Sequence, residues 1–230
     1  MDLATARLDD ERRPGKDDRT ARYDQTRERV IDVAAQLFAR NGYASTGVAQ
    51  IGEAAQLAKG ALYYYIESKD ALLAAIHDRV MDPLLAEGKK IFELELSAPA
   101  RLTLLSESLM FQIVHRRDHV RVFLHEYHQL QGESRARFHA KRTAFESYVT
   151  RLLAEGTAAG DLEVRDLRLT TLAWLNLHNY TYQWIQQESR VPYEVLSAQY
   201  CDIFFRGVGA APSSTLDDEV QRGRRLLREG

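Results

Sequence analysis

The chain of 230 residues contains one cysteine, five prolines and 13 glycines, and each of these small numbers excludes something. Cys201 has no second thiol with which to form an intrachain disulfide. No apolar run approaches the roughly 20 residues that a membrane-spanning helix requires, and the first residues contain no charged-then-apolar leader. We therefore expect a cytoplasmic protein without an intrachain disulfide.

An excess of positive charge is also missing, since 31 Lys and Arg residues face 33 Asp and Glu residues. Many nucleic-acid-binding domains are basic, so this balance counts against DNA binding. What the chain does contain is 45% hydrophobic residues, which are grouped at helical spacing with no regular train of alternating strands. These groupings predict an all-α fold of one or two domains.

Changes in composition divide the sequence into four parts. Residues 1–21 contain charges of both signs, Pro14-Gly15 and almost no aliphatic side chains, which predicts a flexible N-terminal arm. Residues 22–69 are expected to form a small helical domain, and residues 70–209 a larger one. Residues 210–230 are expected to be a flexible tail, with one frayed helix over 216–228 as the alternative.

The small domain is predicted to contain three helices. Along the first, apolar residues from Val30 to Phe38 form one stripe, which ends at Asn41-Gly42 as a left-handed C-cap would. Ser45 or Thr46 is expected to cap the second helix, and the third begins near Ala58. The longer helices are expected over 69–95, with Pro83 as a place for a bend, and over 99–116, 118–130, 134–159, 166–187 and 192–209.

Three helices, the second and third short and joined by a tight turn, are typical of a helix-turn-helix, although many small bundles share that pattern. The residues themselves are more specific. Phe38–Tyr43 (FARNGY), Ser45–Ile51 (STGVAQI) and Ala58–Leu73 (AKGALYYYIESKDALL) resemble the TetR/AcrR family of one-component transcriptional repressors. The resemblance implies an N-terminal DNA-binding domain, a C-terminal domain for ligand binding and dimerisation, and a homodimer that binds a palindromic operator in double-stranded DNA.

The same resemblance assigns DNA-contacting roles to individual residues. It places Thr46 on a phosphate at the start of the second helix, Lys59, Gly60 and Ala61 in the major groove, and Tyr63, Tyr64 and Lys69 on backbone or bases. Independently of it, Gly60 and Ala61 are small enough for close approach to DNA, and three consecutive tyrosines on one helix cannot all be buried. Packing inside the bundle is the alternative for Tyr63 or Tyr65.

One departure from the family pattern affects base recognition. This chain has Ala49 where related sequences commonly have an arginine that could read guanine, so base contacts are expected from Gln50 and Tyr64. Segment 22–69 contains six cationic and five anionic side chains, which leaves it with little electrostatic attraction for DNA.

The two last long helices indicate a dimer. Apolar residues lie on two sides of the 166–187 helix, and the 192–209 helix repeats the theme, which suits a four-helix interface around a two-fold axis. The residues expected in that interface are Leu172, Asn176, Tyr180, Leu196, Tyr200, Ile203, Phe204 and Gly207. The alternative is that both stripes belong to the intramolecular core.

The middle helices are expected to enclose a ligand pocket, because they combine aromatic side chains with a few polar groups. Its expected lining is Leu109, Phe123, Glu126, Tyr127, Tyr148, Trp174, His178 and Tyr182, any of which could instead be plain core. Residues 179–185, 191–195 and 200–207 are similar to an actinobacterial branch of the family that responds to acyl-CoA thioesters of lipid and steroid breakdown. That similarity implies an acyl-CoA or a bulky hydrophobic acid as effector, with a drug-responsive regulator as the alternative.

Other classes of function remain as alternatives. His115 and His119, and His125 and His128 near Glu126, have spacings that place two imidazoles on one helix face, but no third metal ligand is fixed by the sequence. The chain has no Gly-rich phosphate loop and no nucleophile elbow, so no catalytic residue, metal or cofactor is expected. A helical enzyme or scaffold without DNA affinity is the alternative of another class.

Overall fold

The computed structural model describes residues 16–185, 191–209 and 215–229, and within these ranges every regular element is a helix. This confirms the all-α expectation. The elements are α1 (Lys16–Asn41), α2 (Val48–Ala54), α3 (Lys59–Tyr65), α4 (Lys69–Phe92), α5 (Ala98–His115), α6 (Arg117–His125), the 3-10 turn η1 (Tyr127–Gln129), α7 (Gly132–Ala159), α8 (Leu167–Asn179), α9 (Thr181–Trp184), α10 (Tyr193–Gly207) and α11 (Leu216–Glu229). None of the helices in these ranges has both the length and the apolar character needed to cross a membrane.

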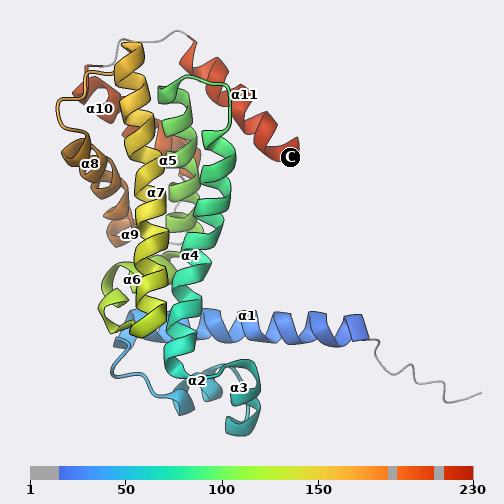
Figure 1. Cartoon of the computed structure of the whole chain (residues 1–230). Coiled ribbons are helices and arrows are strands. Elements are labelled where there is room, and N and C mark those ends of the chain that lie inside the picture. Colours follow the sequence, from blue (N-terminus) through green and yellow to red (C-terminus); the bar gives the residue numbers. More distant parts are fainter. Residues whose placement is uncertain (1–15, 186–190, 210–214, 230) are drawn as a thin grey trace, which may run out of the picture.

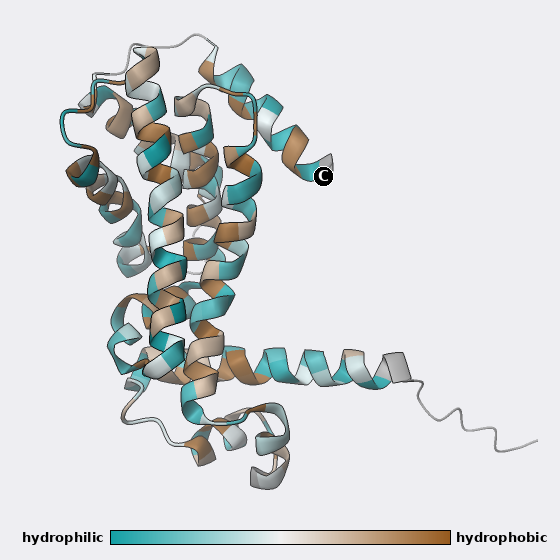
Figure 2. Cartoon of the chain, in the orientation of Figure 1, coloured by the Kyte–Doolittle hydropathy of each residue, from teal (hydrophilic) through white to brown (hydrophobic). Residues whose placement is uncertain are grey.

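The helices form two parts, which we call the head (α1–α3) and the body (α4–α11). In Figure 1, α1 crosses beneath the body, α2 and α3 lie below it, and α4 rises from the head into the body. Within the body α4, α5 and α7 pack side by side, with α8 and α9 on one flank and α11 on the other. Figure 2 shows that the half of α1 far from the body is mostly hydrophilic, whereas the half beneath it contains the apolar stripe.

The head has its own hydrophobic core, but that core does not stop at residue 69. It includes buried residues of α1, α2 and α3, then Leu72 and Ile76 of α4 and Val122 and Phe138 of α6 and α7. The expected boundary between residues 69 and 70 therefore cuts through a packed cluster. The first two turns of α4 belong to the core of the head, because their buried apolar side chains pack in the same cluster as those of α1, α2 and α3.

The turns of the head follow the sequence signals closely. Gly42 adopts φ +82° and its N–H donates to the carbonyl of Phe38 at 2.9 Å, which is the expected left-handed end of α1. The hydroxyl of Ser68 accepts a hydrogen bond from the N–H of Ala71 at 3.0 Å and so caps α4.

Three expectations differ from the structure. α1 begins at Lys16, so residues 16–21 of the expected arm are helical, because extending an existing helix costs far less than nucleating one; residues 1–15 lie outside the described ranges. The expected 166–187 helix breaks at Tyr180, where the buried Thr181 and Tyr182 are bonded to Tyr200 and His125. The expected 118–130 helix ends at His125 and continues as η1.

The tail takes the alternative of a helix over 216–228 and is not the flexible segment that we expected first. Residues 216–229 form the ordered helix α11, which packs on α5. Leu216, Val220, Gly223 and Leu227 recur every three or four residues and form one face that fits against the body. Abundant charge on the other side of this helix is what made the segment resemble a flexible tail.

Candidate nucleic-acid interface and effector cavities

Helix α3 separates its residues into an inner and an outer face. Leu62 is fully buried and Ile66, directly after the helix, is 6% exposed, whereas Tyr63 is 49% exposed and Tyr64 is 69% exposed. Gly60 and Ala61 also lie on the surface. The outer face therefore combines two small residues with two phenols, which allows close approach to a duplex and hydrogen bonding to phosphates or base edges.

Tyr23 of α1 packs against two of the tyrosines of α3. The ring of Tyr23 lies 5.3 Å from that of Tyr64, edge to face, and 5.2 Å from that of Tyr65, stacked. Tyr65 is thus the half-buried tyrosine of the three. Tyr63 is exposed and does not pack inside the bundle, which was the alternative for it. Because aromatic pairs of this geometry add stability beyond their buried area, Tyr23 holds the outward orientation of Tyr64.

The predicted DNA-contacting residues Thr46 and Gln50 both have local hydrogen-bond partners at the start of α2. Thr46 is 1% exposed and its hydroxyl donates to the carbonyl of Gly42 at 2.9 Å, so this side chain fastens the turn that precedes α2. The second helix is capped at Gly47, not at Ser45 or Thr46, and the side-chain oxygen of Gln50 accepts from the N–H of Gly47 at 2.8 Å. Gln50 is exposed, but its carbonyl oxygen already has this local partner.

The two predicted lysine contacts differ in what surrounds them. Lys59 opens α3 with its backbone, and its side chain lies outside the described part. The ammonium of Lys69 lies 4.1 Å above the ring of Tyr43. Burial, and then the hydrogen bond to Asp70, raise the pKa of the Tyr43 hydroxyl, which therefore stays protonated and donates to Asp70.

A charged cluster joins the head to the body. Asp32 of α1 contacts Arg79 of α4 at 3.6 Å and His119 of α6 at 3.2 Å, and Arg116 donates to the carbonyl of Arg79 at 2.7 Å. Burial alone would raise the pKa of Asp32, but the His119 hydrogen bond and the neighbouring arginines outweigh it and lower that pKa. Glu126 adds a second link, since it accepts from the backbone N–H of Tyr43 at 3.3 Å.

The eight predicted ligand residues do not line one cavity. Leu109 and Phe123 do lie together, at an apolar cavity of about 40 Å³ between α4, α5, α6, α7 and α8. The rest of its lining is Val80, Met81, Leu84, Val120, Arg142, Phe145, Glu146, Leu175 and Asn179. Small-molecule sites are typically several hundred Å³, so this central cavity has the right chemistry for an acyl chain but too little space in this conformation.

The remaining six predicted residues have other surroundings. Trp174 and His178 are fully buried core, and Tyr182 is 5% exposed and bonded to His125. Tyr148 packs on Phe92 and against Gly88 of α4. Tyr127 stacks on Phe138 near the surface, and Glu126 lies at the junction of head and body. Trp174 and His178 therefore pack as core residues, and neither lines the central cavity.

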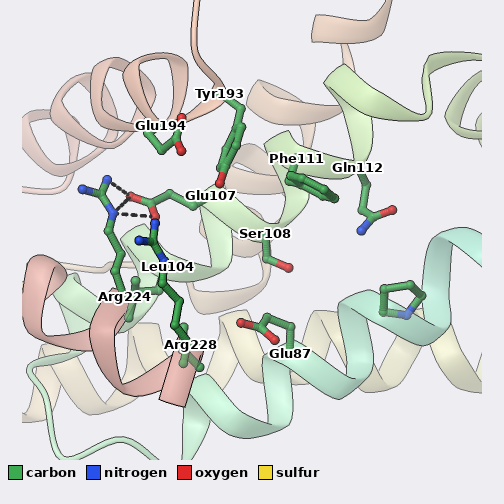
Figure 3. Close-up of a pocket in the computed structure, with 12 residues that line it drawn as sticks. Glu87, Leu104, Glu107, Ser108, Phe111, Gln112, Tyr193, Glu194, Arg224 and Arg228 are labelled. Atoms are coloured by element: carbon green, nitrogen blue, oxygen red, sulfur yellow. Dashed lines mark hydrogen bonds and ion pairs between the residues drawn. The ribbon is translucent and has the colours of Figure 1, made fainter. Parts of the chain in front are cut away.

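A larger groove lies where sequence reasoning did not place one. It has a volume of about 340 Å³ and lies between α4, α5, α10 and α11, as Figure 3 shows. Its lining is Pro83, Glu87, Leu104, Glu107, Ser108, Phe111, Gln112, Tyr193, Glu194, Arg224, Leu227 and Arg228. The signal that could have revealed it is the apolar stripe of α11, because a helix with such a stripe must cover part of the body.

The predicted dimer residues divide between surface and core. Tyr180 is 68% exposed and Ile203 is 53% exposed, and Asn176 and Gly207 also lie on the surface. Leu172 and Tyr200 are half-buried. Leu196 and Phe204 are each 9% exposed and pack inward, so they do not belong to an outer face. α8 and α10 thus present a partly apolar surface that Leu169 (62% exposed) and Val195 (54% exposed) enlarge.

The histidine pairs have partners other than a metal. His119 contacts Asp32, and His115 stacks on Phe111 with ring centroids 4.3 Å apart. Within the described ranges, no group of three His, Cys, Asp or Glu side chains is placed to hold a metal ion.

The long helix α1, followed by the short helices α2 and α3 with an exposed aromatic face on α3, is typical of a helix-turn-helix DNA-binding regulator. Residues 30–76 match the family model for bacterial regulatory proteins of the tetR family, and residues 95–208 match that for the tetracyclin repressor-like C-terminal domain. The chain belongs to the TetR family of bacterial transcriptional regulators, which act by binding DNA and are not enzymes.

Individual relatives share most of their length with this chain. The HTH-type transcriptional repressor KstR2 of Rhodococcus jostii is 25% identical over 191 residues, which are 80% of this chain and 91% of the relative. A tetR-family regulatory protein from Rhodococcus RHA1 has a TM-score of 0.74 at 25% identity, covering 82% of this chain and 99% of its own. AibR, solved with isovaleryl coenzyme A and operator DNA, shares the fold with a TM-score of 0.68 at 23% identity, covering 78% and 98%.

Proposed function

We propose that the protein is a homodimeric transcriptional repressor that binds a palindromic operator through α3 and is released by a hydrophobic acyl-CoA thioester. The observation that carries this proposal is the outer face of α3. There Gly60, Ala61, Tyr63 and Tyr64 are exposed above the buried Leu62. Lys59 belongs to the same proposed DNA-binding face by its position at the start of the helix.

The proposed dimer forms through α8 and α10. A second copy related by a two-fold axis would cover the exposed side chains of Leu169, Tyr180, Val195 and Ile203, which are costly to leave in water. Two copies also place two recognition helices on one duplex, about 34 Å apart for successive major grooves. The symmetry of the dimer then explains the palindrome.

The proposed effector site is the central cavity at Leu109 and Phe123. Because that cavity measures about 40 Å³, an acyl chain must select a conformer in which α4 and α7 stand further apart. α4 begins at Lys69, directly after α3, so its movement changes the spacing of the recognition helices. The KstR2 repressor and the AibR complex with isovaleryl coenzyme A support an acyl-CoA as the effector class.

A gel-shift titration with the DNA upstream of the protein's own gene tests the DNA-binding half. We expect a shift that weakens steeply as salt increases, because phosphate contacts release counterions. Tyr64→Ala should weaken the shift. Tyr64→Phe keeps the ring that packs on Tyr23 and removes only the hydroxyl, so it separates the contributions of the two groups. An unchanged affinity of Tyr64→Ala would remove α3 from the interface.

Acyl-CoA thioesters, free acids and coenzyme A added to the shifted complex test the effector half. Leu109→Phe fills part of the central cavity and should preserve the shift while abolishing release. Leu226→Phe, a similar enlargement at an exposed position of α11, is the matched control. Release of both variants at equal thioester concentrations would place the effector elsewhere, and release by a cationic drug instead of a thioester would favour the drug-responsive alternative.

A further inference from the structure

Helix α11 is built into the body as a separate covering element. It lies beyond residue 208, where the match to the family's C-terminal domain ends, and it packs on α5. A Cβ added at Gly223 would lie 2.5 Å from a terminal methyl of Leu104, so a larger residue here would force that side chain to move. At the other end of the contact, Glu219 of α11 accepts from the backbone N–H of Ser97 at 3.1 Å.

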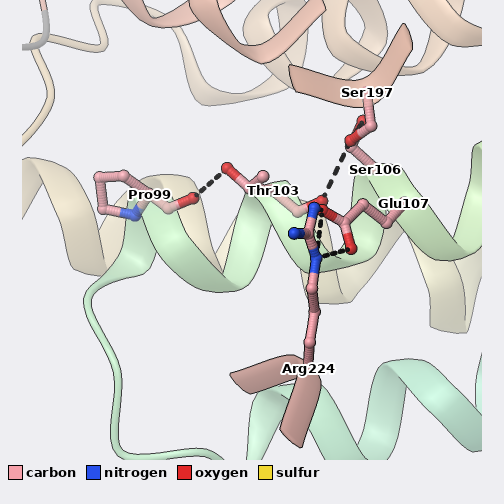
Figure 4. A network of polar contacts seen from close by, with 6 residues as sticks. All are labelled: Pro99, Thr103, Ser106, Glu107, Ser197 and Arg224. Atoms are coloured by element: carbon pink, nitrogen blue, oxygen red, sulfur yellow. Dashed lines mark hydrogen bonds and ion pairs between the residues drawn. The ribbon is translucent and has the colours of Figure 1, made fainter. Parts of the chain in front are cut away.

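Glu107 is the residue of α5 that α11 neutralises. Its side chain is nearly buried, with 7% of the residue exposed, between apolar positions such as Leu104 and Met110. Arg224 donates from Nε to one carboxylate oxygen at 2.9 Å and to the other at 3.2 Å, and Nη2 donates as well. Figure 4 shows how Arg224 reaches across from α11 to this carboxylate. A buried carboxylate without a cation is strongly unfavourable, so Glu107 defines a cation position.

The groove of about 340 Å³ lies beside that position, and its charges are divided between elements. The carboxylates are Glu87 of α4, Glu107 of α5 and Glu194 of α10, whereas both cations, Arg224 and Arg228, come from α11 (Figure 3). Without α11 the charged lining of the groove would therefore be anionic throughout. The pKa of the Tyr193 phenol is raised, first by burial and then by its hydrogen bond to Glu194.

The same groove has an aromatic wall. Phe111 of α5 and Tyr193 of α10 meet edge to face with their centroids 5.4 Å apart. Their rings offer a surface for an apolar or aromatic body, and π faces also attract cations.

We propose that this groove is a second ligand site, selective for organic cations with an apolar body, and that Arg224 of α11 occupies its cation position as a built-in competitor. The ammonium group of a ligand replaces the guanidinium of Arg224 on Glu107, and its apolar body lies on Phe111 and Tyr193. α11 must then leave α5. Because the ligand binds only those molecules in which α11 is displaced, the apparent affinity for the ligand is reduced in proportion to that fraction.

Fluorescence titration of the full chain without DNA tests this site. The probes are dansylcadaverine, which ends in an ammonium, and dansyl-6-aminohexanoate, which has the same ring and a similar linker but ends in a carboxylate. We expect Arg224→Ala to bind the ammonium probe about tenfold more tightly than the unaltered protein. Glu107→Gln should not bind it detectably, and Arg225→Ala, an exposed arginine on the same helix, should bind it like the unaltered protein.

Two results would overturn the proposal: equal affinity of Arg224→Ala and the unaltered protein for the ammonium probe, or equal binding of the carboxylate probe. Should Arg224→Ala fail to fold, as judged by circular dichroism, hydrogen exchange of the unaltered protein decides. The ammonium probe should accelerate amide exchange in residues 216–229 while α5 stays protected, and unchanged exchange would contradict displacement. Because no DNA is present, failure here leaves the proposed repressor function untouched.

Discussion

The proposed DNA-binding face of the head and the interior of the body place their aromatic side chains differently. In the head, Tyr63 and Tyr64 point outward from a small core, whereas in the body Trp174 is fully buried. A surface that binds a rigid duplex has to be preformed, so its residues are exposed in the structure without DNA. A cavity that opens for a ligand is filled by core side chains in the closed conformation, so ligand binding requires those side chains to move apart.

The largest effect is expected when contacts are removed from the outer face of α3 and the body is left intact. Lys59→Ala combined with Tyr64→Ala should lower operator affinity about a hundredfold or more, since each lost contact of this kind is worth roughly 1–3 kcal/mol. Gel shift measures the affinity, and size-exclusion chromatography should show an unchanged oligomeric state. Retained affinity with a normal elution volume would contradict the assignment of α3.

The head could be predicted well because its signals are local. Gly42 and Ser68 act where their turn chemistry placed them, and the stripe from Val30 to Phe38 is the buried face of α1. Thr46 shows the limit of such reasoning. A threonine before a short helix is a common cap, but here a backbone carbonyl within reach takes its hydroxyl inward.

The body is tested next through Trp174. Trp174→Ala should lower the free energy of unfolding by about 3–5 kcal/mol, because a fully buried indole leaves a large void. Chemical denaturation measures this loss. Tyr127→Ala, at a partly exposed aromatic residue, should cost markedly less. If Trp174→Ala left the free energy of unfolding nearly unchanged but weakened the effector response, Trp174 would belong to the ligand site.

The body could not be predicted residue by residue, because helical spacing shows which face of a helix is apolar but not what covers it. Leu196 and Phe204 share a stripe with Ile203, yet the first two pack into the core and the third is exposed. The fit of α11 depends on Gly223 meeting Leu104, and residues so distant in sequence give no local signal of their contact. The eight expected ligand residues were dispersed for the same reason.

A smaller effect distinguishes the polar interior of the body from the exposed head. Burial lowers the pKa of His178 to about 4, and its Nδ1 donates to the carbonyl of Trp174 at 2.6 Å while Nε2 accepts from Ser106 at 2.7 Å. The unfolded chain, with an ordinary histidine pKa near 6.5, takes up the proton first. The free energy of unfolding should therefore fall by about 3 kcal/mol between pH 6.5 and pH 4.

Denaturant titrations across that pH range measure the effect. His178→Gln, which does not titrate there, should flatten the profile relative to the unaltered protein. His128→Gln, at an exposed histidine, should leave the slope as it was. A steep profile that survives in His178→Gln would assign the acid sensitivity to other groups.

The smallest effect on stability is expected where head and body meet. Asp32→Asn weakens the contacts of α1 with Arg79 and His119, and for a half-exposed carboxylate the loss should be about 0.5–1 kcal/mol. The pKa of Asp32 is lowered in the folded protein, so this contribution to stability is complete above an ordinary pKa of 3.8 and disappears as the pH falls below it.

The same substitution should have a larger effect on release of the operator by the effector, because movement of α4 and α6 would reach the head through the contacts of Asp32. We expect Asp32→Asn to bind the operator normally but to need more effector for release, with exposed Asp24→Asn as the control. Equal effector requirements in the two variants would mean that the contacts of Asp32 do not couple the cavity to the DNA.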